Sequence, residues 1–157
     1  MELDFVSCFD VACELGRGCA STAWTGVNLL IHHWMLALYD ERAQQEVWGA
    51  NPEALIASGI AYPQGSAKRE KRDGSDGFLV SGRWNFSSAV NVADWNMLAC
   101  QVKEGDKVVD HRMCLLPKDD YEIVDDWHVL GMRSTGSMTV VAKDVFVPEH
   151  RALCAYD

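Results

Sequence analysis

The feature that most constrains the fold is a long segment without formal charge. No Asp, Glu, Lys or Arg occurs from Cys19 to Tyr39. Because an uncharged helix has no face suited to water, such a segment predicts a helix that is buried among other helices. Apolar side chains recur in it at the i, i+3, i+4 and i+7 spacing of an α-helix for roughly four turns. These side chains are Trp24, Val27, Leu30, Ile31, Trp34, Met35 and Leu38.

Few helical partners are predicted elsewhere in the chain. Residues 4–15 carry apolar side chains at helical spacing and end at Gly16-Arg17-Gly18, and a short helix is predicted over Asp40–Trp48. Ser21 or Thr22 is the predicted N-cap of the uncharged helix. Since so few helices cannot cover the uncharged one on all sides, we expect other chain segments or subunits to pack against it.

A polar stripe runs along the uncharged helix. Thr25, Asn28 and His32 share one side of it, because i+3 and i+7 positions lie within about 60° of one another. One interpretation is that His32 or His33 is a core histidine bonded to a backbone carbonyl. The functional interpretation is that one of the two faces a ligand cavity.

After Asn51-Pro52 the apolar pattern changes from a helical period to a two-residue period. The basic cluster Lys68–Arg72 and the Asp73–Gly77 segment that follows it predict a solvated loop. Regular spacing of short strands predicts an α+β fold, with N-terminal helices followed by an antiparallel β-sandwich or barrel. The predicted strands are residues 54–62, 78–88, 95–102, 108–116, 121–124 and 137–147.

The strand from Phe78 to Ser88 ends in an unusual cluster of side chains. Trp84 and Phe86 are two residues apart, which predicts that both aromatic rings lie on one face of the strand. Ser87 and Ser88 then offer two hydroxyl groups and backbone N–H groups to one planar heteroaromatic ligand. A hairpin edge with core aromatics and turn serines is the alternative interpretation.

Composition excludes several classes of partner. Fourteen basic and 23 acidic residues give a net charge of −9, which is the wrong sign for binding nucleic acid or an anionic membrane. The six cysteines form no C-x-x-C pair, so we expect reduced thiols and no metal site. Without a long apolar run or a signal sequence, the chain is expected to be a single globular domain in the cytoplasm.

Several segments carry a family resemblance, and they occur in order over nearly the whole chain. On them the chain resembles the acyl-CoA dehydrogenase superfold, and most closely its branch of two-component, reduced-flavin-dependent aromatic monooxygenases. This branch includes the oxygenase of 4-hydroxyphenylacetate hydroxylase and the pigment production hydroxylases. The segments are Ser21-Thr22-Ala23-Trp24, His32-x-Trp34-x-Leu36-Ala37-Leu38, Pro63-x-Gly65-x-Ala67, Gly82-Arg83-Trp84-x-Phe86-Ser87-Ser88, Ala93-Asp94-Trp95, Gly131-Met132-Arg133-x-Thr135-Gly136-Ser137 and Val145-Phe146-Val147-Pro148.

The resemblance implies a domain organisation. In the family a helical domain, a middle β-domain and a carboxy-terminal four-helix bundle hold a flavin. Residues 1–50 are then part of the helical domain, residues 51–150 are the middle β-domain, and residues 151–157 begin a linker to a helical domain that is absent. We therefore expect a fragment, in which the carboxy-terminal catalytic and flavin-phosphate residues of the family have no counterpart.

The resemblance also implies an enzyme activity. A flavin reductase, a transient partner, supplies reduced FMN or FAD, which reacts with oxygen to give the C4a-hydroperoxide. The peroxide then hydroxylates a phenolic or other aromatic substrate. The implied assembly is a homo-oligomer, a tetramer in the family. The protein keeps the peroxide dry and hydrogen-bonded until it meets the substrate.

Individual residues match functional positions of the family. Ser87, with Ser88 as its fallback, matches the position near flavin N5, and His32 matches the histidine near the peroxide and the phenol. Trp24 and Ser58 match positions on the substrate side. The other positions that match cofactor contacts are Trp84, Phe86, Arg133, Thr135 and Ser137.

Some features leave alternatives open. Residues 127–137 match a loop beside the flavin, often across a subunit boundary, but a Gly-rich strand connection with His128 on the surface is the alternative. Ala89 stands where relatives usually have Gly. Two other functions stay open: an acyl-CoA dehydrogenase-like flavin oxidoreductase and a non-catalytic remnant. Against the dehydrogenase, Tyr62-Pro63-Gln64-Gly65 and Phe86-Ser87-Ser88-Ala89 replace its Thr-Glu and Ile-Thr-Asn-Gly motifs.

Overall fold

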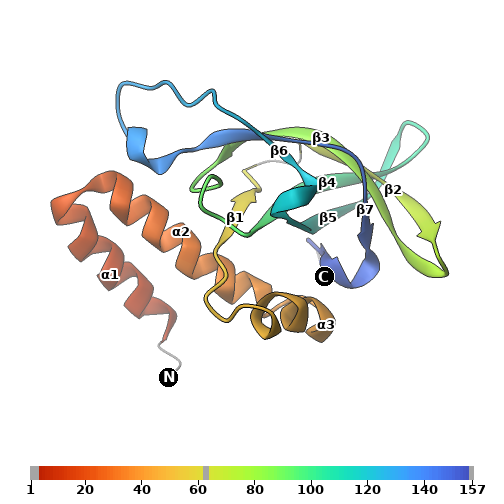
Figure 1. The fold of residues 1–157 in the computed structure, drawn as a ribbon, viewed down its shortest axis with the longest axis horizontal. Coiled ribbons are helices and arrows are strands. Elements are labelled where there is room, and N and C mark those ends of the chain that lie inside the picture. The colour runs from red at the N-terminus through yellow and green to blue at the C-terminus, as the bar shows by residue number, and fades with distance from the viewer. Residues whose placement is uncertain (1–3, 62–63, 156–157) are drawn as a thin grey trace.

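Helices at the amino terminus lead into one large β-sheet in the computed structural model, which describes residues 4–61 and 64–155 (Figure 1). This confirms the predicted α+β class. The helical elements are α1 (Phe5–Gly18), α2 (Ala20–Leu36), α3 (Glu41–Gln44), the π-helical turn η1 (Gln45–Gly49) and the 3-10 turns η2 (Lys118–Asp120), η3 (Arg133–Thr135) and η4 (Glu149–Arg151).

The two long helices begin differently. Asp4 caps α1, because its carboxylate accepts a hydrogen bond of 2.9 Å from the backbone N–H of Ser7. Cys19 occupies the N-cap of α2 without a side-chain bond, so the predicted cap at Ser21 or Thr22 is wrong. The α1 helix continues through Gly18 and leaves only one residue before α2 begins, which places both serine and threonine inside the second helix.

The sheet contains eight strands in the order β6-β7-β3-β2-β4-β5-β8, with β1 paired to β4. All its pairings are antiparallel except those of β1 and β2 with β4, which are parallel. The strands are β1 (Ile56–Gly59), β2 (Gly65–Arg72), β3 (Ser75–Ser87), β4 (Trp95–Glu104), β5 (Lys107–Pro117), β6 (Glu122–Val124), β7 (Met138–Pro148) and β8 (Ala152–Cys154).

The charged segment after Lys68 is part of a hairpin, so the predicted loop is wrong over most of its length. Residues 68–72 belong to β2 and pair with residues 75–79 of β3. The connection consists of Asp73 and Gly74, with φ angles of 51° and 82°. An Asp-Gly pair with two positive φ angles is typical of the type I′ turn that joins two-residue hairpins. The charges lie on an exposed ribbon.

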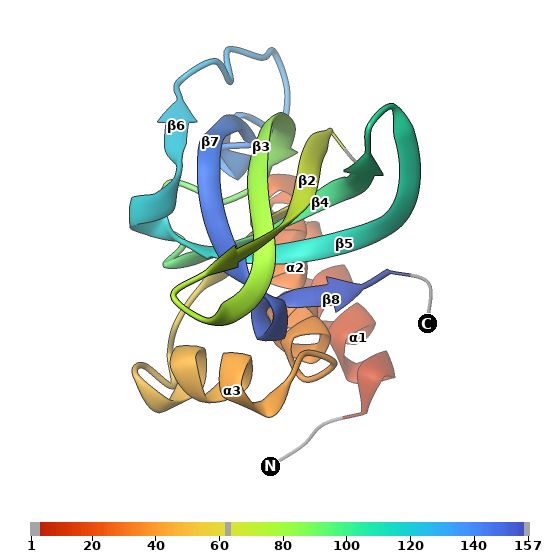
Figure 2. The same ribbon diagram turned by 90° about the vertical axis from the view of Figure 1, so that its right-hand side faces the viewer.

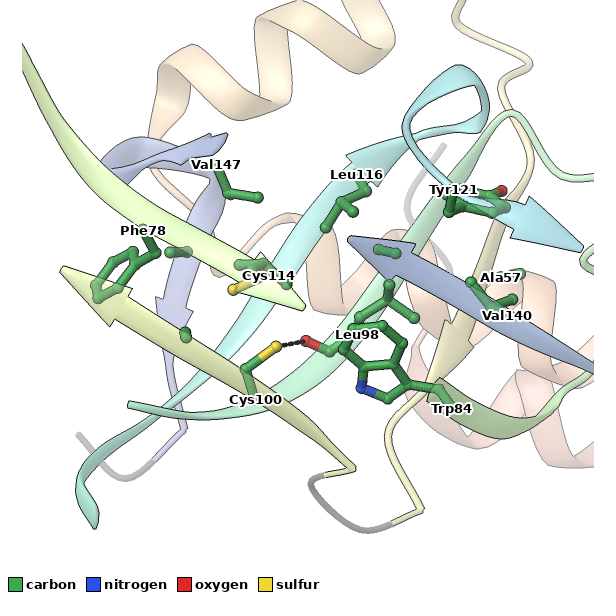
Figure 3. Packing of buried hydrophobic residues seen from close by; sticks show 14 of the residues in the cluster. Ala57, Phe78, Trp84, Leu98, Cys100, Cys114, Leu116, Tyr121, Val140 and Val147 are labelled. Carbon is green, nitrogen blue, oxygen red and sulfur yellow. Dashed lines mark hydrogen bonds between the residues drawn. The ribbon is translucent and has the colours of Figure 1, made fainter. Parts of the chain in front are cut away.

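Two clusters of buried side chains lie on opposite faces of β4 and β5. Leu98 of β4 and Cys114 of β5 belong to a cluster that also includes Val140 of β7, whereas Met97 and Leu115 pack against the helices. Alternate residues along a strand face opposite sides, which produces this division. Since β5 and β7 are not neighbours in the sheet, the sheet must curl to bring them into one cluster, and Figures 2 and 3 show this arrangement.

The α1–α2 pair leaves apolar side chains at the surface. No residue of α1 is buried, and Phe9 and Trp34 are each about half exposed, at 52% and 55%. None of the described helices is long and apolar enough to cross a membrane. The uncharged character of α2 is therefore not matched by burial within the described chain.

Candidate active site

A cavity of about 520 Å³ lies between α2, the end of β3 and the segment that leads into β7. Its volume falls in the range of about 300–1,000 Å³ that is common for small-molecule sites. The residues that line it are Trp24, Asn28, His32, Ser58, Ile60, Ala61, Phe86, Ser88, Trp127, Met132, Thr135 and Ser137. With the end of β1 and the residues after it, four segments that are distant in the sequence thus meet at one place.

His32 is the titratable side chain of this cavity. Its Nδ1 lies 2.6 Å from the backbone carbonyl oxygen of Ile56, and the side chain is buried. Because a carbonyl can only accept, Nδ1 carries the hydrogen and Nε2 is the acceptor of the neutral ring. Burial lowers the pKa of His32, so the ring is neutral at pH 7.

The neighbouring histidine has a different environment. Nδ1 of His33 accepts a hydrogen bond of 3.0 Å from Nε1 of Trp48, and the two rings are stacked with centroids 6.1 Å apart. His33 therefore packs against η1. Of the two histidines that the sequence left as alternatives, His32 is the one that reaches the cavity.

A row of hydrogen-bonded hydroxyl groups forms one wall of the cavity. Nε1 of Trp24 donates to Oγ of Ser88 at 2.9 Å, and Oγ of Ser88 lies 2.8 Å from Oγ of Ser137. Ser137 in turn lies 2.7 Å from Oγ1 of Thr135, which donates to the carbonyl oxygen of Met132 at 2.9 Å. We call these residues the hydroxyl chain. It connects α2, the end of β3 and the η3 turn.

The end of β3 has a strained backbone. Phe86 and Ala89 have φ angles of 67° and 62°, a left-handed conformation that is uncommon for residues with a Cβ atom. The backbone N–H of Ala89 donates to the carbonyl of Thr135 at 2.8 Å, which holds this end of β3 against η3. Strained backbone is often found at functional sites.

The structure brings together seven of the ten predicted site residues and leaves out three. Trp84 lies in the core, where its Nε1 donates to the carbonyl of Ala99 at 2.8 Å (Figure 3). Ser87 is also buried, and its Oγ accepts a bond of 3.0 Å from Nδ2 of Asn96. Arg133 is exposed on η3. The residues that line the cavity are Trp24, His32, Ser58, Phe86, Ser88, Thr135 and Ser137.

The prediction that Trp84 and Phe86 share a face is wrong. Trp84 is fully buried, whereas Phe86 is 55% exposed. The pairing of β3 with β7 shifts between Trp84 and Ser87, and the positive φ of Phe86 lies within this irregularity. An irregular pairing interrupts the alternation on which the two-residue rule depends. As a result Phe86 and Ser88 line the cavity, and Ser87 points into the protein.

Several cavity residues were not singled out from the sequence. Trp127 lies beside Phe86, with ring centroids 6.2 Å apart, and donates to the carbonyl of Met132 at 3.1 Å. Trp127 is the first residue of the loop over residues 127–137 that the resemblance implies beside a flavin, although it was not predicted as a site residue by itself. Ile60 and Ala61 carry no such signal, because small apolar residues after a strand are common. Thr25, part of the predicted polar stripe, is not among the lining residues.

A larger groove of about 1,210 Å³ lies elsewhere, between Arg42, the β2–β3 hairpin and η4. Among its charged side chains, Arg112 lies 3.7 Å from the carboxylate of Glu149. None of the predicted site residues lines it. Size alone therefore does not identify the site. In the described parts of the chain no three His, Cys, Asp or Glu residues are grouped to hold a metal ion.

Comparison with known proteins shows close relatives. The chain is 44% identical over 145 residues to the flavin-dependent monooxygenase oxygenase subunit HsaA of Mycobacterium tuberculosis, covering 92% of this chain and 36% of that protein. It is 39% identical to the oxygenase component of the FADH2-dependent resorcinol hydroxylase of a Rhizobium species, covering 96% of this chain and 36% of the relative. The chain thus spans little more than a third of the length of these relatives. No family model matches it.

Solved structures agree with the sequence comparison. The crystal structure of HsaA from M. tuberculosis superposes with a TM-score of 0.86 at 44% identity, over 93% of this chain and 37% of that one. XiaF from a Streptomyces species, solved in complex with FADH2 and glycerol, gives a TM-score of 0.82 at 33% identity, over 93% and 36% of the two chains. The fold is therefore the acyl-CoA dehydrogenase-like fold that the sequence resemblance implied.

Proposed function

Because this chain is homologous to part of the oxygenase components of flavin-dependent aromatic monooxygenases, we propose that it belongs to an enzyme that hydroxylates a phenolic or other aromatic compound. In this proposal a separate reductase supplies reduced FMN or FAD, and the oxygenase is a homo-oligomer. The observation that carries the proposal is the cavity in which a neutral histidine, exposed aromatic rings and the hydroxyl chain converge.

The cavity residues fit a flavin ring. Trp24 and Phe86 are more than half exposed, at 52% and 55%, so flat apolar faces are available for an isoalloxazine. Ser88 and Ser137 place hydroxyl oxygens where the polar edge of such a ring can bond. Arg133, exposed on η3, is proposed as a contact to the cofactor outside the cavity. When bound, reduced flavin supplies the electrons that activate dioxygen for transfer of one oxygen atom to the substrate.

His32 has the properties of an acceptor for a phenol hydroxyl. Its Nδ1–H is committed to the Ile56 carbonyl, which fixes the ring orientation and leaves Nε2 as the available nitrogen. A phenol that donates to Nε2 gains electron density on its oxygen and on the ortho carbons, which favours attack on an electrophilic oxygen.

Flavin binding and oxygen transfer test the proposal in sequence. The chain is titrated anaerobically with reduced FMN and reduced FAD, and the complex is then mixed with ¹⁸O₂ and a panel of phenols. We expect reduced flavin to bind and one ¹⁸O atom to enter the phenol. Oxidation of acyl-CoA thioesters in place of phenol hydroxylation would support the dehydrogenase alternative. Failure to bind either flavin would support the non-catalytic alternative.

A further inference from the structure

The two consecutive histidines of α2 hold opposite tautomers. Nδ1 of His32 lies 2.6 Å from the carbonyl oxygen of Ile56, which can only accept, so the hydrogen of the neutral ring is on Nδ1. Nδ1 of His33 lies 3.0 Å from Nε1 of Trp48, and an indole nitrogen can only donate. The neutral ring of His33 therefore carries its hydrogen on Nε2. Each tautomer is imposed by a partner whose hydrogen-bonding role cannot change.

The two rings must consequently respond differently to acid. His32 can take a second proton on Nε2 and keep its bond to the Ile56 carbonyl. His33 can take a second proton only on Nδ1, the nitrogen that accepts from Trp48, so two N–H groups would then point at each other. Protonation of His33 and its bond to the indole therefore exclude each other.

The surroundings of His33 do not favour a positive charge. None of the ion pairs in the described parts of the chain includes His33. Glu46 is paired with two basic side chains of η4, and the other charged residues in the list below are exposed. Burial lowers the pKa of His33, against a smaller opposite effect of the Ala54 carbonyl, so the ring is neutral at pH 7. The titratable and charged residues on the elements around His33 are His32, Asp40, Glu41, Arg42, Glu46, Glu53 and Asp94.

The bond to Trp48 holds the end of α2. The helix ends at Leu36, and among the described residues the side-chain hydrogen bonds from its last two turns to other elements are those of His32 and His33. Trp48 lies in the π-helical turn η1, whose Val47 is fully buried in the same cluster as Leu36. Single π-helical turns are frequent at functional sites. Loss of the indole bond would leave the end of α2 attached by apolar packing and by His32 alone.

We propose that Trp48 and His33 are positioning residues for His32, because their bond fixes the last turns of α2 and with them the place at which His32 enters the cavity. This inference rests on the proposed function, in which His32 accepts the hydroxyl of the phenol. The bond is intact at neutral pH. Since the folded-state pKa of His33 is lowered, it is lost only as the pH falls below about 6.5.

Nuclear magnetic resonance tests the tautomers on the unmodified chain. In long-range ¹H–¹⁵N spectra of ¹⁵N-histidine-labelled protein at neutral pH, we expect hydrogen on Nδ1 of His32 and on Nε2 of His33. His32→Gln and His33→Gln assign the two rings. On acidification the indole N–H resonance of Trp48 should shift with the titration of His33. The same tautomer at both histidines, or an indole resonance that does not follow His33, would overturn the inference.

A variant tests the positioning role. Trp48→Phe keeps an aromatic ring and removes the donor, so the proton affinity of His33 should rise about fivefold, because only the neutral ring accepts the indole bond. The Nδ1–H of His32 should exchange with solvent about fivefold faster. Trp95→Phe is the matched control, since Trp95 packs against the same buried cluster from β4 and should leave both quantities unchanged.

Circular dichroism verifies that each variant is folded. Unchanged exchange of the His32 Nδ1–H in folded Trp48→Phe would refute the positioning role, and if this variant does not fold, the tautomers and the titration of the unmodified chain decide. None of these measurements uses flavin. Opposite tautomers together with failed flavin titrations would therefore overturn the proposed function and leave this inference standing.

Discussion

Replacement of Gly65 by Ala should be one of the most destabilising small substitutions in this protein. A Cβ atom at Gly65 would overlap Cζ2 of Trp84 and lie 2.7 Å from its Cε2 and 3.0 Å from Sγ of Cys100. The indole cannot retreat freely, because it is fully buried and its Nε1 donates to the carbonyl of Ala99 at 2.8 Å. The paired residue in β3, Gly82, is in equally close contact, since a Cβ atom added there would lie 2.6 Å from Cα of Gly65.

The magnitude follows from two contributions. Overpacking a close-packed core costs about 1–3 kcal/mol, and displacing the indole so that its N–H loses its partner adds about 1–3 kcal/mol. Replacing Gly by Ala lowers the entropy of the unfolded chain and returns about 0.4–1 kcal/mol. We therefore expect the free energy of unfolding to fall by about 2–4 kcal/mol. For a chain of this size that corresponds to a Tm decrease of about 10 °C.

Urea denaturation followed by circular dichroism measures this change. Gly18→Ala is the matched control, because a Cβ atom there would meet nothing within 4 Å at the end of α1. The control should unfold at the same or a slightly higher urea concentration, since Ala is the better helix former by about 1 kcal/mol. If Gly65→Ala and Gly18→Ala change the unfolding midpoint equally, the tight packing against Trp84 is not a constraint.

Four further predictions follow from individual contacts. Ala89→Gly should stabilise the fold by about 0.5–1 kcal/mol in thermal melts, because φ of Ala89 is 62°. Ala50→Gly is the control: φ of Ala50 is −82°, so this substitution should destabilise the fold in the same melts. Burial lowers the pKa of His32 in the folded state, so the unfolded chain binds the proton first. Stability should therefore decrease as the pH falls through about 6.5, with a shallower slope in His32→Gln. His32→Ala should slow phenol hydroxylation in stopped flow while reduced-flavin binding persists. Ser87→Ala removes a buried hydroxyl outside the cavity, so it should leave both hydroxylation and flavin binding close to wild type. A large loss of coupling between flavin oxidation and hydroxylation in Ser87→Ala would return Ser87 to the site. The exposed apolar residues of α1 and α2 should make the chain self-associate in sedimentation, and a strictly monomeric species would contradict this.

Periodicity in the sequence was sufficient to predict the main elements. The change from helical to two-residue spacing near Asn51-Pro52 separates the helices from the sheet, and most predicted strands lie within a few residues of the observed ones. The charged stretch from Lys68 was assigned to a loop because its composition is polar throughout. Composition does not distinguish a loop from an exposed hairpin. The Asp73-Gly74 pair does, because it is a strong signal for a two-residue hairpin turn.

The site was less predictable, because it depends on where a strand stops being regular. A two-residue rule places Trp84 and Phe86 together and separates Phe86 from Ser87. The register shift between β3 and β7 reverses the first of these relations, and no local pattern in the sequence signals it. Spacing along α2 was partly reliable: of the predicted stripe, Asn28 and His32 line the cavity, whereas Thr25 does not.

The motif Gly82–Ser88 therefore combines two physical functions in one strand. Its first half belongs to the core: Gly82, together with Gly65, leaves the space that the indole of Trp84 fills. Its second half, past the register shift, presents Phe86 and Ser88 to the cavity. Because the indole is bonded and buried immediately before the irregular segment, its position sets the direction in which the strand leaves the core. A substitution that moves Trp84 should consequently weaken ligand binding even in chains that remain folded, although no atom of Trp84 lines the cavity.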